Sequence, residues 1–90
     1  MYVIDASMAP GTPAGSQVIV RSYQHPSPGH IGVFALLSSE ELLVRRLIDK
    51  AEVPFAIRPD NANYGAARTI TKHDKPIIIG AVAAAWVRPI

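Results

Sequence analysis

The stretch Leu42-Leu43-Val44-Arg45-Arg46-Leu47-Ile48-Asp49 decides the fold, because it places two adjacent arginines inside an apolar run. On a helix, neighbouring side chains point about 100° apart, so both arginines would reach water. On a strand, neighbours point to opposite faces of the sheet, so one arginine is directed towards the other side. If that side is a core, the inward arginine needs a partner or a function, because an unpaired buried charge is very costly.

Two secondary-structure interpretations of this stretch are open from the residues alone. Ser38-x-x-Glu41 is a capping-box pattern, and the apolar residues that follow repeat at helical spacing. The periodicity therefore predicts a helix. The alternative is a β-hairpin composed of a strand, a turn and a second strand (residues 31–37, 38–41 and 42–49).

The rest of the chain consists of short β-rich runs separated by loops rich in proline and glycine. Proline lacks a backbone N–H, so Pro54 predicts the start or the edge of a strand. Gly80, inside the long final run, is a candidate β-bulge. This pattern of short strands and turns predicts an all-β domain. Besides residues 42–49, the expected strands are residues 2–4, 16–23, 31–37, 53–58, 67–71 and 77–87.

The composition indicates a single globular domain over residues 1–90 and excludes several classes of function. Hydrophobic residues make up 49% of the chain and charged residues 18%, which is typical of a globular protein and not of a disordered one. The absence of cysteine excludes disulfides, thiol catalysis and cysteine-ligated zinc. The net charge of +2 comes from scattered basic residues, which form no stripe suited to a phosphate backbone.

The histidines and the chain ends suggest neither a metal site nor a membrane. His25, His30 and His73 lack metal-ligand spacing, so we expect them to face solvent, with no metal or cofactor bound. Asp5 occurs too early for a signal peptide. The longest apolar run, residues 77–87, is shorter than the about 20 residues that a bilayer requires. We therefore expect a soluble cytoplasmic protein without a membrane partner.

Five short motifs follow one another along the chain. They are Asp5-Ala6-Ser7-Met8-x-Pro10, Val18-Ile19-Val20, Val44-Arg45-Arg46-Leu47, Arg58-Pro59-Asp60-Asn61-x-x-Tyr64 and Ile78-Ile79-Gly80-x-Val82. In this order and spacing they resemble the C-terminal domain of LexA and phage CI-type repressors, the peptidase S24 family that includes the mutagenesis protein UmuD. The resemblance covers almost the whole chain. It implies a strongly bent β-fold of about seven short strands and favours the hairpin interpretation of residues 42–49.

The resemblance also implies roles for individual residues. In the family, the serine of the Ser-Met pair is a nucleophile, and the lysine of a Val-Lys-Arg-Leu strand is its general base. Ser7 matches the nucleophile, whereas Arg45 occupies the lysine position and Arg46 matches the arginine that follows. Lowering a pKa to about 7 requires roughly 5 kcal/mol for a lysine and roughly 9 kcal/mol for an arginine. Because arginine stays protonated in proteins, we expect the Ser7–Arg45 pair to be inactive.

The implied function is that of a dimerisation and regulatory domain of a LexA- or phage CI-like transcriptional repressor, as in the SOS response. The implied partners are a second copy, the activated recombinase filament, and DNA through an N-terminal helix-turn-helix. We expect this chain to lack both that helix-turn-helix and the cleavage linker. One alternative is an active self-cleaving peptidase of the S24 or signal peptidase type. Another is that the resemblance is accidental and that Leu42–Ala51 is a helix packed on a sheet.

Overall fold

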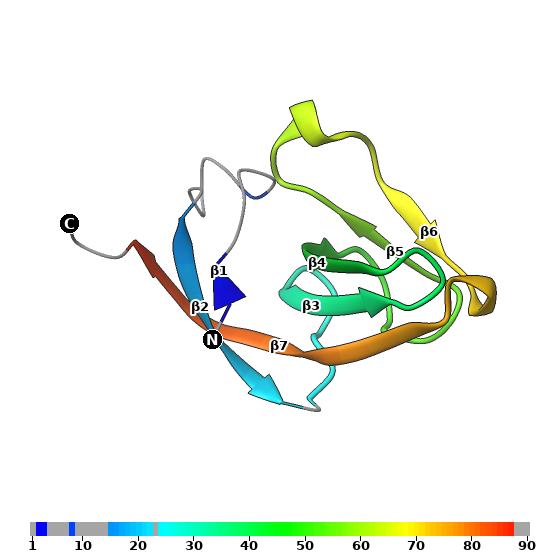
Figure 1. Cartoon of the computed structure of the whole chain (residues 1–90), viewed down its shortest axis with the longest axis horizontal. Coiled ribbons are helices and arrows are strands. Elements are labelled where there is room, and N and C mark those ends of the chain that lie inside the picture. Colours follow the sequence, from blue (N-terminus) through cyan, green and yellow to red (C-terminus); the bar gives the residue numbers. More distant parts are fainter. Residues whose placement is uncertain (1, 4–7, 9–14, 23, 88–90) are drawn as a thin grey trace.

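The computed structural model describes residues 2–3, 8, 15–22 and 24–87, and the strands among them form one antiparallel sheet. The order of the seven described strands is β1-β2-β7-β3-β4-β5-β6 (Figure 1). This architecture confirms the predicted all-β class. The strands are β1 (Tyr2–Val3), β2 (Ser16–Ser22), β3 (Ile31–Leu36), β4 (Glu41–Leu47), β5 (Phe55–Arg58), β6 (Arg68–Ile70) and β7 (Pro76–Val87), with short 3-10 helices η2 (Ala62–Tyr64) and η3 (Lys72–Asp74) between them.

The stretch with the two arginines is a strand, and the β-hairpin interpretation is confirmed. β4 pairs antiparallel with β3, from Ile31 opposite Arg46 to Leu36 opposite Glu41. The helical periodicity was misleading because residues four apart share a face in a strand as well as in a helix. Leu43 and Leu47 therefore face the same core in either structure, and their spacing alone does not discriminate between the two.

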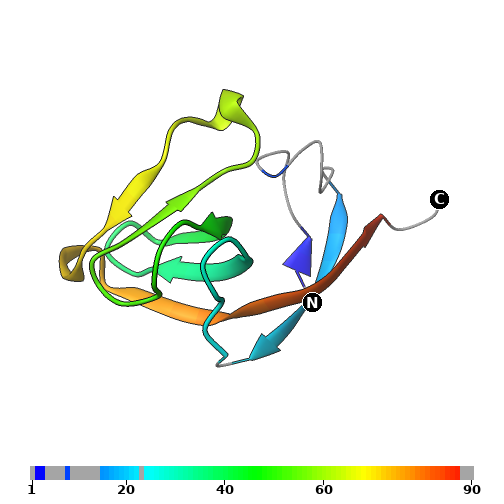
Figure 2. The same cartoon turned by 180° about the vertical axis from the view of Figure 1, so that it is seen from behind.

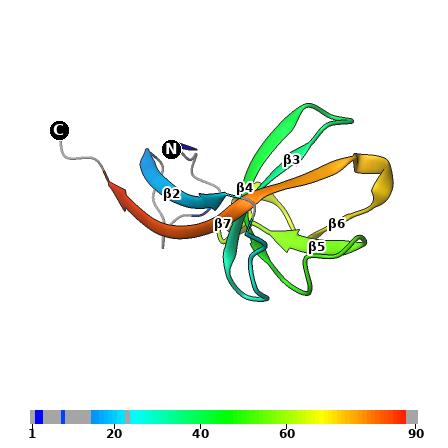
Figure 3. The same cartoon turned by 90° about the horizontal axis from the view of Figure 1, so that it is seen from below.

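β7 is the longest described strand and connects the two parts of the sheet. Its first half pairs with β3 and its second half with β2, and Figure 3 shows β2 and β7 extending together away from β3 to β6. In the pairing with β3, Gly80 and Ile78 lie opposite two consecutive residues, Val33 and Phe34, so that Ile79 is an extra residue. The bulge expected at Gly80 is therefore present beside it. A Cβ atom at Gly80 would overlap the carbonyl oxygen of Arg21, which explains the glycine at this crossing.

The sheet is bent, and each of its two faces buries a separate apolar cluster. Figures 1 and 2 show the β3–β4 hairpin between β7 and the β5–β6 pair, so that the sheet curls around the larger cluster. β4 contributes to both clusters, with Leu47 in the first and Val44 packed against the second. The larger cluster consists of Phe34, Leu36, Leu47, Phe55, Ile57 and Ile70. The smaller consists of Met8 and Val18, with Val20, Ile31, Val44 and Val82 packed against it.

The described loops agree with the remaining expectations. Pro54 directly precedes β5, as predicted for a strand start. His25, His30 and His73 are all exposed, which confirms the prediction that they face solvent. In the part of the chain that the structure describes, no helix is long and apolar enough to cross a membrane.

Candidate active site and its neighbouring ion pairs

Arg46 is held in place by a bidentate ion pair with Asp60. Its Nε donates to Oδ1 of Asp60 at 2.9 Å and its Nη2 to Oδ2 at 2.8 Å. Its Nη1 donates to the carbonyl oxygen of Gly29 at 2.6 Å. These contacts cross-link β4, the loop before β3 and the segment after β5, so Arg46 has a structural role.

The charge of Asp60 is stabilised by its neighbours. Hydrogen bonds from Arg46 are the main reason that the pKa of the Asp60 carboxyl lies below its ordinary value, and partial burial acts in the opposite direction. Arg58 adds a second, longer contact, with Nη1 at 3.3 Å from Oδ1 of Asp60. The same pairing raises the pKa of Arg46, so both partners remain charged over the whole ordinary pH range.

Arg45 leaves β4 on the opposite face and borders a pocket of about 170 Å³. Its Nη1 donates to the carbonyl oxygen of Val44 at 2.9 Å. Ile57, from the larger apolar cluster, forms part of the wall, and Tyr64 from η2 closes another side. Two charged groups, Glu41 and Arg68, complete the polar part of the pocket.

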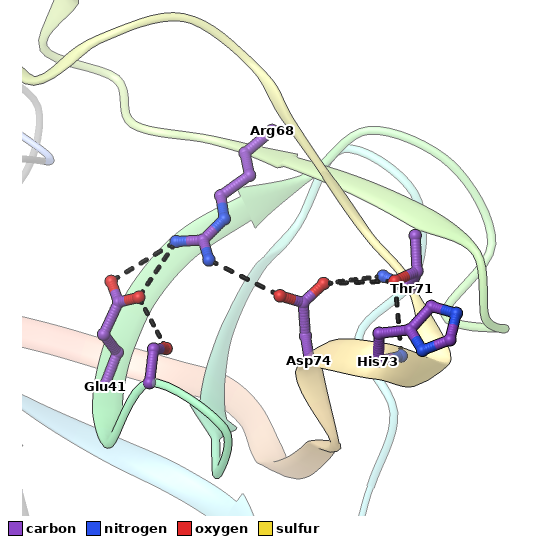
Figure 4. A network of polar contacts seen from close by, with 6 residues as sticks. Glu41, Arg68, Thr71, His73 and Asp74 are labelled. Carbon is purple, nitrogen blue, oxygen red and sulfur yellow. Dashed lines mark hydrogen bonds and ion pairs between the residues drawn. The ribbon is translucent and has the colours of Figure 1, made fainter.

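Glu41 is already paired, as Figure 4 shows. Arg68 Nη1 donates to both carboxylate oxygens of Glu41, at 3.1 and 3.3 Å, and Ser39 Oγ donates to Oε1 at 2.7 Å. The Ser39 hydrogen bond is the largest cause, followed by Arg68, of a Glu41 pKa below the ordinary value. A carboxylate with a lowered pKa is a weak base, so Glu41 is poorly suited to remove a proton from a serine.

Arg68 is shared between this carboxylate and η3. Its Nη2 lies 3.6 Å from Oδ1 of Asp74. Asp74 Oδ2 accepts a hydrogen bond from the backbone N–H of Thr71 at 2.9 Å, which completes a capping box around η3 (Figure 4). Residues 72–74 therefore form a capped helical turn that positions Asp74 beside Arg68.

Ser7, the predicted nucleophile, lies outside the described residues, so its pairing with Arg45 stays a prediction. The next residue, Met8, is completely buried in the smaller apolar cluster. Val44 packs against that cluster, whereas Arg45 starts from the opposite face of β4. Met8 therefore belongs to the cluster on the Val44 face of β4, which is the face opposite to Arg45.

The Arg46–Asp60 pair was missed by reasoning from the sequence. The alternation of a strand indicated that one of the two arginines needs a partner, but it did not indicate which one. The partner lies 14 residues away in sequence. A usable signal was the Arg58-Pro59-Asp60 turn directly after a strand, because β5 pairs with β4 and places Arg58 opposite Arg46.

The fold and the pocket together define an all-β domain built on one bent sheet, with a charged pocket beside its central hairpin. A comparison with protein families gives a match to the Peptidase S24-like family over residues 1–83. The chain therefore belongs to this family, to which the resemblance to LexA and UmuD pointed. A comparison with curated proteins found no significant match.

Proposed function

We propose that this chain is the self-association and regulatory domain of a LexA- or phage CI-like transcriptional repressor, and that it does not cleave peptide bonds. Membership of the Peptidase S24-like family supports the first part. The observation that carries the second part is the position of Arg45, on β4 and at the edge of the charged pocket. The family resemblance implies that the lysine that serves as general base occupies this position of the strand.

The chemistry of the guanidinium argues against the Ser-Lys mechanism. A serine hydroxyl becomes a strong nucleophile only when a base takes its proton. A guanidinium has only donors and is not a base in proteins, so Arg45 can orient a hydroxyl, a carbonyl or a carboxylate but cannot accept that proton. Glu41, the other charged neighbour, is engaged by Arg68 and Ser39. The residues around the pocket are therefore better suited to binding a ligand than to removing a proton from a serine.

The proposal assigns partners as well. The domain pairs with a second copy of itself, and it responds to the activated recombinase filament in the cytoplasm. DNA is contacted through a separate N-terminal domain. No metal or cofactor is part of this function.

Cleavage assays with three variants test the catalytic part. A peptide that contains an Ala-Gly bond is incubated with the wild-type chain, Arg45→Lys, and Arg45→Lys combined with Ser7→Ala, from neutral to alkaline pH. We expect products by mass spectrometry from Arg45→Lys alone, because lysine can lose its proton and the double variant lacks the nucleophile. Serine-dependent cleavage by the wild-type chain would refute the proposal. An inactive Arg45→Lys variant would show that Arg45 does not account for the lost activity.

Sedimentation velocity tests self-association. We expect a monomer–dimer equilibrium that shifts towards the dimer as the concentration rises. A strict monomer at tens of micromolar would contradict the self-association part of the proposal and leave the cleavage result unaffected.

A further inference from the structure

Arg21, on β2, differs from the other arginines that the structure describes. Arg46, Arg58 and Arg68 are in ion pairs, and Arg45 has its own polar contacts. Arg21 is exposed, and its side chain forms neither an ion pair nor a hydrogen bond with another described residue. Its charge is therefore available to a ligand.

Arg21 borders an open pocket of about 280 Å³ that is separate from the pocket beside Arg45. The other polar residues around it are Gln24, His25, Ser27 and His30. They provide two imidazoles and two neutral groups that can donate hydrogen bonds. None of the described lining residues is an aspartate or a glutamate, so the pocket favours an anion.

Small residues on β7 and β3 leave room for a ligand beside Arg21. Arg21 lies opposite Ala81 in the pairing of β2 with β7, so both side chains leave the sheet on the same face. Ala81 is in turn opposite Gly32 of β3, which has no side chain. Ala81 and Ala83 line the pocket, and their short side chains do not fill the space next to the guanidinium.

The loop that carries both histidines is anchored to the sheet. Pro26 is buried and lies so close to Gly32 that a Cβ atom added at Gly32 would overlap the ring of Pro26. The N–H of Gly29 donates to the carbonyl oxygen of Leu47 at 2.8 Å, and the N–H of Leu47 donates to that of His30 at 2.9 Å. An anchored loop loses little conformational entropy when a ligand binds.

We propose that Arg21, His25 and His30 form a binding site for a phosphate group. The planar guanidinium donates two parallel hydrogen bonds to phosphate oxygens, and the imidazoles add donors and, when protonated, charge. The phosphate is either a free ion or a phosphodiester of single-stranded nucleic acid. None of the five motifs behind the family resemblance contains these residues, so the site does not depend on the function proposed above.

The proposed site predicts that an anion of constant charge binds more strongly as the pH falls from about 8 to about 5, the range in which histidine gains a positive charge. The other charged groups near the loop are Arg46, which binds the carbonyl oxygen of Gly29, and its partner Asp60. The pKa of Arg46 is raised and that of Asp60 is lowered, so neither changes charge in this range. For an anion whose own charge is constant over this range, a pH dependence of binding therefore reports on His25 and His30.

NMR titrations of the backbone amides test the site with inorganic phosphate and, separately, with a short oligothymidylate, against chloride at equal ionic strength. We expect shifts centred on residues 21–30 and a Kd about tenfold higher in Arg21→Gln, because a charge-assisted bidentate contact is lost. Lys50→Gln, which removes the same charge from an exposed position outside the pocket, should bind like the wild type. Binding of only one probe identifies the source of the phosphate.

A second titration uses sulfate, whose charge is constant over the range, to isolate the histidines. We expect the pH dependence to disappear in His25→Asn combined with His30→Asn, while the weaker binding through Arg21 remains. The proposal is overturned if neither phosphate nor oligothymidylate shifts these amides, if Arg21→Gln and Lys50→Gln weaken binding equally, or if the double histidine variant keeps the pH dependence. An unchanged spectrum outside residues 21–30 shows that each variant is folded.

Discussion

The two faces of β4 place neighbouring arginines in opposite circumstances. On one face, Arg46 uses three nitrogens to bind Asp60 and Gly29 and joins three segments of the chain. On the other face, Arg45 borders a pocket in which the nearby carboxylate of Glu41 is already paired with Arg68. The difference shows that strand alternation, and not side-chain chemistry, places one arginine in a structural ion pair and its neighbour at the edge of the pocket.

Replacing each arginine by methionine should reveal the largest difference between the faces. We expect Arg46→Met to lower the free energy of unfolding by about 2 kcal/mol, because it removes charge-assisted hydrogen bonds and leaves Asp60 partly buried beside a single, longer contact. Arg45→Met should change it by less than about 1 kcal/mol. Urea unfolding of both variants measures the difference. Equal losses would show that the two faces do not differ in this way.

The acid stability of the protein should depend on the Arg46 face. The pKa of Asp60 is lowered in the folded state, so its stabilising contribution is complete above the unfolded value of about 3.9 and is lost as the pH falls through the folded value. We expect the wild type to lose roughly 1 kcal/mol more than Asp60→Asn when the pH is lowered from about 5 to about 2. Urea unfolding at several pH values provides the measurement. Parallel pH profiles would indicate that the charge of Asp60 contributes nothing.

The smallest effect is expected from the network on the Arg45 face. Glu41 and Arg68 are both more than a third exposed, so water and ions screen their attraction. We expect Glu41→Gln to cost less than about 1 kcal/mol and the cost to shrink further in high salt. Unfolding curves at low and high salt, with Asp60→Asn as the less salt-sensitive comparison, test this. A large loss that is independent of salt would contradict the contrast between the faces.

Much of the fold was predictable from local sequence. Pro54 directly before β5, Gly80 beside a bulge and the exposed histidines all followed from the properties of single residue types. Residues 42–49 were ambiguous, because positions four apart share a face in both helix and strand. Pairing with β3 resolved the ambiguity, since it places Leu43 against the core of a sheet whose other strands come from distant segments.

The candidate sites were predictable only in part. The order of the motifs predicted the family and the position of Arg45 in the place of the general base. The family match supports the predicted family. The gathering of Arg21 with His25 and His30 was not apparent, because in the sequence they are only scattered basic residues. It depends on the pairing of β2 with β7 and on the contact of Pro26 with Gly32.

By itself, the sequence determined the all-β class and the family, and it implied that the two adjacent arginines serve different faces if residues 42–49 form a strand. These properties follow from local patterns of residue types, which can be recognised without knowing which distant segments pair. Only the tertiary structure decided that Arg46 takes the structural partner and that Arg45 borders the pocket. The physical reason is that the register between β4 and β5 brings Asp60 to one face alone, and register depends on the packing of the whole sheet.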